Sequence, residues 1–225
     1  SQRVLGSVRC AADRHWQMRL GRAGHRIARP ALRNLYPSGK LLSSGTLEVS
    51  DGFELYYEEY GAEDGVPAVF LHGGPGAGFT QNMGRLFDLK RYRVVLFHQR
   101  GCKKSLRKDD STAGGQLEGN TTWHLVEDLE ALRAHLGFDK WVVGGGSWGS
   151  CLAVAYATRH PERVTAVVMR AAFLFRAAEL EHFCGPRGRA RTCHAAAWRS
   201  FTDWLPWAEE ASAHTIAAAY RRAAL

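Results

Sequence analysis

The 225-residue chain lacks the features that would place it in a specialised class of protein. No stretch approaches eighteen uncharged apolar residues, so no transmembrane helix is expected. No Cys-x-x-Cys pair occurs, and five cysteines without paired spacing favour neither a zinc site nor a disulfide framework. A composition of 45% hydrophobic and 23% charged residues is that of an ordinary globular domain. We therefore expect reduced thiols and a cytoplasmic protein.

Acidic residues are almost absent from the first 33 residues, which hold eight arginines, no lysine and one acid, Asp13. This segment carries +7 of the formal net charge of +8, so the remainder is nearly neutral. Nucleic-acid binding is not expected, because the basic residues lie in a tail and one loop without an aromatic stacking pattern. We expect residues 1–34 to be a basic extension, poorly ordered and dispensable. The alternative is a transit segment to an organelle.

Short apolar runs alternate with helical patterns from residue 46 onward. The runs are Val66–Leu71, Tyr92–Phe97, Trp141–Val143 and Val164–Met169. Ahead of them, Asp51-Gly52 predicts a hairpin turn between two strands over 46–50 and 53–60. Helices are predicted over 120–136, ending at Gly137, and over 150–159. This order predicts an α/β fold, with a mostly parallel sheet and helices on both faces.

The end of the chain differs in kind, because only helical patterns follow Phe175. They cover residues 177–183, 195–205 and 209–224, with a basic loop over 185–191. We expect a core over residues 35–175 and a partial helical cap over residues 176–225.

The pentapeptide Gly145-Gly-Ser147-Trp-Gly149 stands between an apolar run and a helix. A nucleophilic serine at a tight strand-to-helix turn needs small residues two positions before and two after it, where a Cβ would collide. The turn lifts Oγ above the sheet and aims the Trp148 N–H at a developing oxyanion. We interpret the segment as a nucleophile elbow. The alternative is a plain glycine turn with a bystander serine.

A second glycine-rich segment, His72-Gly-Gly-Pro-Gly76, follows the run Val66–Leu71. Its glycines let the backbone approach a ligand and leave an N–H free for an oxyanion. A phosphate-binding loop is disfavoured, because the segment has neither Gly-Lys-Ser/Thr nor G-x-G-x-x-G spacing. We expect His72 to shape this loop through hydrogen bonds rather than to act as a base.

Five motifs together resemble those of the proline iminopeptidase family, which are serine peptidases with the α/β-hydrolase fold. They are His72–Gly76, Gln99-Arg-Gly-Cys102 with Ser105, Asn120–Trp123, Gly145–Ser150 and His160–Val164. The resemblance covers about residues 35–183. It implies an α/β-hydrolase core followed by the start of a helical cap, with the last core strands missing.

By this resemblance Ser147 is the nucleophile, and the backbone N–H groups of Gly74 and Trp148 form the oxyanion hole. Phe173 matches the aromatic position that packs on the substrate proline ring, and Gly73 lies in the same substrate site. The implied reaction removes an N-terminal proline from a short peptide through an acyl-enzyme. The resemblance implies no metal and no organic cofactor. From the charge distribution and the lack of a long apolar stretch we expect neither a nucleic acid nor a membrane as partner. The resemblance leaves the oligomeric state open.

The chain departs from the family pattern at three places. His98 stands where the family has aspartate, which we expect to remove a partner of Arg100. Lys103-Lys104 replace Gly-Arg, and His124 replaces an acid in the helix that begins near residue 120.

The histidines after Ser147 are His160, His182, His194 and His214. None follows a strand, where this fold carries its base, so the triad acid and histidine are not found here. We therefore expect a C-terminally truncated chain that is weakly active or inactive. The alternatives are an esterase or amidase of the same fold, and a non-catalytic relative that binds peptides or a partner protein.

Overall fold

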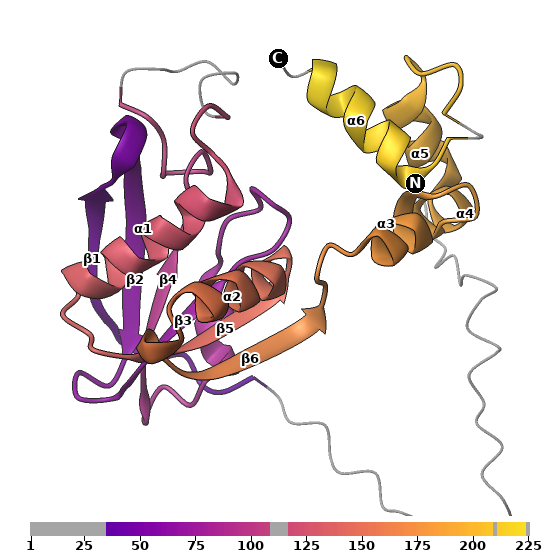
Figure 1. The fold of residues 1–225 in the computed structure, drawn as a ribbon. Coiled ribbons are helices and arrows are strands. Elements are labelled where there is room, and N and C mark those ends of the chain that lie inside the picture. The colour runs from indigo at the N-terminus through magenta and orange to yellow at the C-terminus, as the bar shows by residue number, and fades with distance from the viewer. Residues whose placement is uncertain (1–34, 109–116, 209–210, 224–225) are drawn as a thin grey trace, which may run out of the picture.

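A six-stranded sheet forms the centre of the computed structural model, which describes residues 35–108, 117–208 and 211–223 (Figure 1). The strands are β1 (Leu41–Glu48), β2 (Glu54–Gly61), β3 (Val66–Leu71), β4 (Tyr92–Phe97), β5 (Trp141–Ser147) and β6 (Val164–Ala172). Their order is β1-β2-β4-β3-β5-β6. β4, β3, β5 and β6 run parallel, and β1 and β2 join antiparallel at one edge. The predicted α/β fold class is confirmed, whereas the basic extension lies outside the described residues.

The hairpin predicted at Asp51-Gly52 connects β1 to β2. Asp51 and Gly52 both have positive φ, at 59° and 73°, a conformation that aspartate and glycine tolerate better than other residues. β1 begins at Leu41, five residues before the predicted start. The polar residues Ser43-Ser44 gave no strand signal in the sequence. In the structure Ser43 Oγ donates a hydrogen bond of 2.6 Å to Glu59 on the paired strand β2.

Two helices, α1 (Thr122–His135) and α2 (Trp148–Arg159), cover one face of the sheet (Figure 1). α1 ends just before Gly137, whose φ of 72° suits the predicted cap. A large buried cluster fills this side, with Trp141 and Tyr156 fully enclosed. The other face carries a second cluster, against which the short helix η3 (Gln81–Leu86) packs. The core therefore holds β3, β4 and β5 from both sides.

The C-terminal helices form a separate group beyond the end of β6 (Figure 1). They are α3 (Ala177–Cys184), α4 (Arg189–Cys193), α5 (Ala195–Thr202) and α6 (Ala213–Ala223). The expected loop over 185–191 is wrong in part, because α4 begins inside it. Arg191 ties α4 to the rest of this group, since its guanidinium stacks on Trp198 at 5.0 Å and donates a 3.0 Å hydrogen bond to the Ala211 carbonyl. Across the described residues, no helix has the length and apolar character needed to cross a bilayer.

Candidate active site at the carboxyl edge of the sheet

Ser147 lies where β5 ends and α2 begins, as the pentapeptide predicts. Its backbone has φ 54° and ψ −122°, a strained conformation for a residue with a Cβ. The six residues before it in β5 are buried, and Ser147 is exposed. The strand and helix thus hold the serine at the carboxyl edge of a parallel sheet, open to solvent.

The two flanking glycines are required by backbone contacts. A Cβ on Gly145 would lie against the carbonyl of Gly149 and within 2.8 Å of the Ser150 nitrogen. A Cβ on Gly149 would collide with the Leu71 carbonyl and lie 2.9 Å from that of His72. Atoms this close cannot be accommodated by a rotamer change, because both partners are main chain. The spacing of the pentapeptide is therefore enforced by the close approach of α2 to β5 at Gly145 and to β3 at Gly149.

The second glycine-rich segment lies at the same edge of the sheet. A Cβ on Gly73 would be 2.9 Å from the Gly146 carbonyl and 3.1 Å from Ser147 Cβ. Gly74 has φ 106°, a value that favours glycine. The loop from His72 to Gly76 therefore packs directly on the turn that carries Ser147, where the oxyanion-hole prediction requires it.

His72 is a structural residue of this loop. It is fully buried, and its Nδ1 donates a 3.0 Å hydrogen bond to the Gly73 carbonyl. Its Nε2 accepts the Gln99 N–H at 3.1 Å, so the ring is neutral with its proton on Nδ1. Burial lowers the pKa of His72 below its usual value, which favours the uncharged ring at neutral pH. The expectation that His72 shapes the loop is confirmed.

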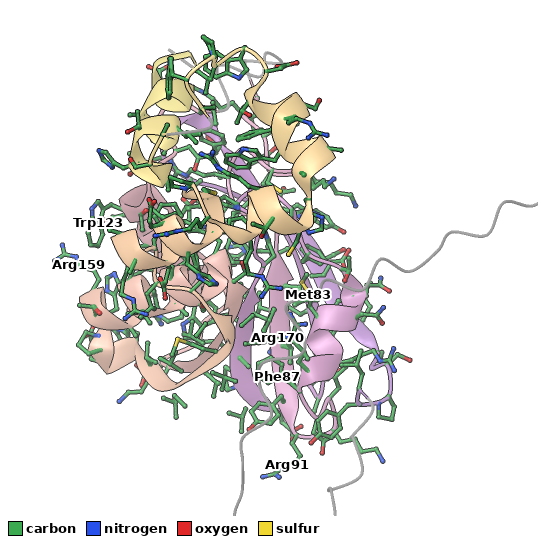
Figure 2. The ribbon with its side chains drawn as sticks, turned by 90° about the vertical axis from the view of Figure 1, so that its right-hand side faces the viewer. Met83, Phe87, Arg91, Trp123, Arg159 and Arg170 are labelled. Carbon is green, nitrogen blue, oxygen red and sulfur yellow. The ribbon has the colours of Figure 1, made fainter. Side chains whose placement is uncertain are left out.

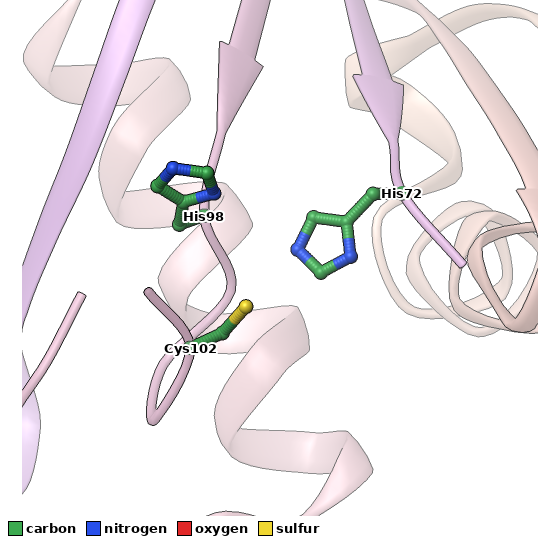
Figure 3. Close-up of side chains that lie close together, drawn as sticks. All are labelled: His72, His98 and Cys102. Atoms are coloured by element: carbon green, nitrogen blue, oxygen red, sulfur yellow. The ribbon is translucent and has the colours of Figure 1, made fainter. Parts of the chain in front are cut away.

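His72, His98 and Cys102 lie close together, with one possible ligand atom of each within 4.8 Å of the others (Figure 3). Two imidazoles and a thiol could suit a soft metal ion. Possible ligand atoms of this cluster are already engaged in hydrogen bonds. His98 Nδ1 accepts the Phe79 N–H at 3.2 Å, and Cys102 Sγ donates to the Gly76 carbonyl at 3.0 Å. With His72 Nε2 engaged as well, the cluster supports the loop through hydrogen bonds and we assign it no metal.

The expected loss of a partner for Arg100 is wrong. Its guanidinium is buried and donates to both carboxylate oxygens of Asp128, at 2.5 and 2.7 Å. A further bond of 3.2 Å reaches Asp51. His98 does not face Arg100 but stacks on the ring of Phe79 at 4.2 Å. Arg100 therefore fastens the loop after β4 to α1, and its anchoring does not depend on an acid at position 98.

The predicted aromatic residue Phe173 lies directly after β6 and is tied to the elbow. Its N–H donates a 2.9 Å hydrogen bond to Ser150 Oγ, and the Ser150 hydroxyl donates to the Ser147 carbonyl at 2.6 Å. Phe173 packs edge-on against Phe175, which packs against Trp148. Ser150 was missed by sequence reasoning, because nothing local indicates that its partner is 23 residues away.

A cavity of about 450 Å³ opens beside Ser147. Figure 2 shows Met83 from η3 and Arg170 from β6 on the same side of the sheet, and both line this cavity. Its other walls combine the glycine loops with apolar side chains, a surface suited to a small, mostly apolar group. They include Gly73, Gly74, Phe70, Ala77 and Leu86.

No general base is brought to the serine by the described part of the chain, where the Ser147 hydroxyl makes no hydrogen bond to a histidine. His160 follows α2 and packs on Tyr156 at 5.2 Å. His182 lines a separate cavity of about 290 Å³ with Phe173 and Glu179. The arrangement holds an exposed serine against a glycine-rich loop, and the described residues supply no histidine bonded to it.

The model of a family with the α/β-hydrolase fold matches residues 67–184, more than half of the chain. The chain belongs to the α/β-hydrolase family. It is 48% identical over 180 residues to a proline iminopeptidase of Arabidopsis thaliana, covering 80% of this chain and 45% of that relative. A Xylella fastidiosa proline iminopeptidase is 43% identical over 191 residues, covering 85% of this chain and 58% of that relative.

Among solved structures, a Vigna radiata epoxide hydrolase mutant matches this α/β-hydrolase with a TM-score of 0.50 and 28% identity, covering 60% of this chain and 40% of that chain. The chain spans about half the length of the curated relatives it matches. The resemblance read from the five motifs is confirmed by these relatives.

Proposed function

We propose that this chain is the nucleophile-bearing part of a serine aminopeptidase that releases N-terminal proline from short peptides. The observation that carries the proposal is the strained Ser147 turn packed against the Gly73–Gly74 loop. The names of the curated relatives supply the substrate class. Four free thiols among the described residues fit a reducing compartment such as the cytoplasm.

In the proposed reaction, Ser147 Oγ attacks the carbonyl carbon of the N-terminal prolyl residue. The backbone N–H groups of Gly74 and Trp148 receive the oxyanion of the tetrahedral intermediate. Collapse of the intermediate breaks the peptide bond, so that the rest of the peptide leaves as an amine carrying the proton lost by the serine, and a prolyl ester remains on Ser147. Water then hydrolyses the ester to free proline and restores the serine hydroxyl. Phe173 packs on the proline ring and Gly73 forms part of the same site. The reaction uses no metal and no organic cofactor, and its base and triad acid are not assigned to this chain.

The test compares hydrolysis of a chromogenic proline amide by the 225-residue chain and by a product extended to the length of the curated relatives. We expect negligible turnover by the short chain, because a serine without its base is a poor nucleophile. The extended product should turn over, and Ser147→Ala should lower its kcat by about 10⁴-fold or more. Ser43→Ala, on β1 far from the elbow, is the matched control.

Three outcomes would contradict the proposal. Hydrolysis of simple acyl esters without hydrolysis of proline amides would indicate an esterase of the same fold. Saturable binding of proline-ended peptides without turnover would indicate a non-catalytic relative. Strong turnover by the 225-residue chain would show that one of its own histidines acts as the base.

A further inference from the structure

Gln99 connects the two loops that flank the nucleophile. It lies two residues beyond β4 and its side chain is buried. Its Nε2 donates a 2.9 Å hydrogen bond to the backbone carbonyl of His72. Its Oε1 accepts a 3.0 Å hydrogen bond from the indole Nε1–H of Trp148. One amide group thus joins the loop that begins at His72 to the first residue of α2.

These two attachment points matter because of what stands next to them. The His72 carbonyl belongs to the peptide unit immediately before Gly73-Gly74, and the indole belongs to Trp148 itself. Gly74 and Trp148 are the residues whose N–H groups form the proposed oxyanion hole. We infer that Gln99 is a positioning residue that sets the separation of these two donors, an inference that rests on the proposed function.

Glutamine has the required chemistry at this place. A planar amide offers a donor and an acceptor on opposite sides, which match a carbonyl oxygen on one loop and an indole N–H on the other. Glutamate would keep the acceptor but place a carboxylate against the His72 carbonyl. Methionine would fill a similar volume with neither bond. The His72 carbonyl is buried and Trp148 is partly buried, so a lost bond leaves the carbonyl without its partner out of reach of water.

The loops need such a connection because they leave different strands. The His72 loop follows β3, and the Ser147 turn follows β5. The first contains glycines at 73, 74 and 76, with positive φ at Gly74 and Gly76, so little in the chain itself fixes its path. Oxyanion donors act over hydrogen-bond distance, and loss of a single donor costs about 10²–10³ in kcat in other serine hydrolases.

Gln99 is not placed to contact substrate. It does not line the 450 Å³ cavity beside Ser147 or the 290 Å³ cavity beside Phe173. Its effect must therefore pass through the backbone of the two loops. Such a residue should change kcat while leaving KM nearly unchanged, because ground-state contacts are untouched.

The first arm of the test uses the 225-residue chain and needs no activity. Amide hydrogen exchange is measured at residue 99, whose N–H binds His72 Nε2, and at Phe79, whose N–H binds His98 Nδ1. We expect Gln99→Met to speed exchange at both sites by about tenfold or more, because the loop is released. Gln99→Glu, which keeps the indole bond but sets a carboxylate against the His72 carbonyl, should also speed exchange at both sites. Leu132→Ala, in the core cluster under α1, controls for general destabilisation.

The second arm measures kinetics on the product extended to the length of the curated relatives. Gln99→Met is expected to lower kcat for a proline amide by about 10- to 100-fold, with KM within about threefold. Trp148→Phe, which removes the indole N–H but not the backbone N–H, should lower kcat in the same direction. The double variant should be no worse than Gln99→Met alone, because both changes break one connection.

The two arms separate the inference from the proposed function. If the wild-type extended product hydrolyses no proline amide, the proposed function fails and exchange still decides whether Gln99 holds the loops. Exchange no faster in Gln99→Met than in Leu132→Ala overturns the inference. So does an unchanged kcat in folded Gln99→Met, or a double variant whose loss is the product of the single losses.

Discussion

Two neighbouring strands of the sheet, β5 and β6, differ sharply in their surroundings. They run parallel and pair along almost their whole length, and both begin with branched or aromatic apolar residues. β5 is buried at every residue except Ser147. β6 is exposed at every residue except Val164, which is partly buried. Val143 is fully buried, whereas its register partner Val167 is 38% exposed.

The difference shows that position in the sheet, rather than strand sequence, decides how firmly each side of the site is held. β5 lies between β3 and β6 and carries Ser147. We call this the closed side of the site, because backbone contacts at Gly145 and Gly149 leave no room for a Cβ. β6 is an edge strand in the described sheet and leads to Phe173 on an open side. A run such as Val-Thr-Ala-Val-Val-Met is typical of a parallel strand covered on both faces. The nucleophile should therefore tolerate little change, and the aromatic side of the site more.

The largest effect is expected from glycines on the closed side. Gly149→Ala should lower the free energy of unfolding by about 3 kcal/mol or more, because the new Cβ meets backbone carbonyls of β3 and its following loop. Gly146→Ala is the matched control, since its Cβ would lie 3.5 Å from the nearest atom, on the ring of Phe70. We expect it to cost less than about 1 kcal/mol. Urea unfolding of both variants measures the difference, and equal losses would contradict the steric account.

The sequence predicted those features whose cause is local. The Ser147 turn follows from the spacing of Gly145 and Gly149, and the hairpin follows from Asp51-Gly52. A Cβ on Gly145 would meet Gly149 and Ser150, and the hairpin depends on positive φ at Asp51 and Gly52, so a sequence pattern records both directly. The contact that requires Gly149 is made by β3 and was not visible in the sequence.

Contacts between distant segments could not be predicted in the same way. Gln99 belongs to a recognised motif, but its partner Trp148 is 49 residues away. Ser150 carried no signal at all for its bond to Phe173. Arg100 was expected to lose a partner, because its bond to Asp128 joins segments 28 residues apart. Propensity and periodicity describe a single segment, so they cannot say which polar groups meet when the sheet assembles.

The next effect concerns how the free energy of unfolding depends on acid pH through His98, which directly follows β4. Burial, with smaller contributions from His72 and Lys104, lowers the pKa of His98 to about 4. An unfolded histidine titrates near 6.5, so between pH 6.5 and 4 only the unfolded chain gains a proton at this position. The free energy of unfolding is therefore not reduced by His98 above pH 6.5, and it decreases as the pH falls from 6.5 toward 4. The loss should be at most about 3 kcal/mol.

His98→Asn tests this dependence, because its Oδ1 can still accept the Phe79 N–H without binding a proton. We expect the variant to lose less free energy of unfolding than wild type between pH 7 and pH 4. Parallel pH profiles for His98→Asn and wild type would show that His98 is not protected from protonation in the folded chain.

The smallest effect compares the two strands directly. Val143→Ala removes two methyl groups from a closed cluster and should lower the free energy of unfolding by about 2 kcal/mol. Val167→Ala, directly opposite on β6, should cost less than about 1 kcal/mol, because its side chain is partly in water. Equal costs would mean that β6 is covered in solution. Repeating the measurement at several protein concentrations then identifies the cover, since a cost that grows with concentration indicates a second copy of the chain.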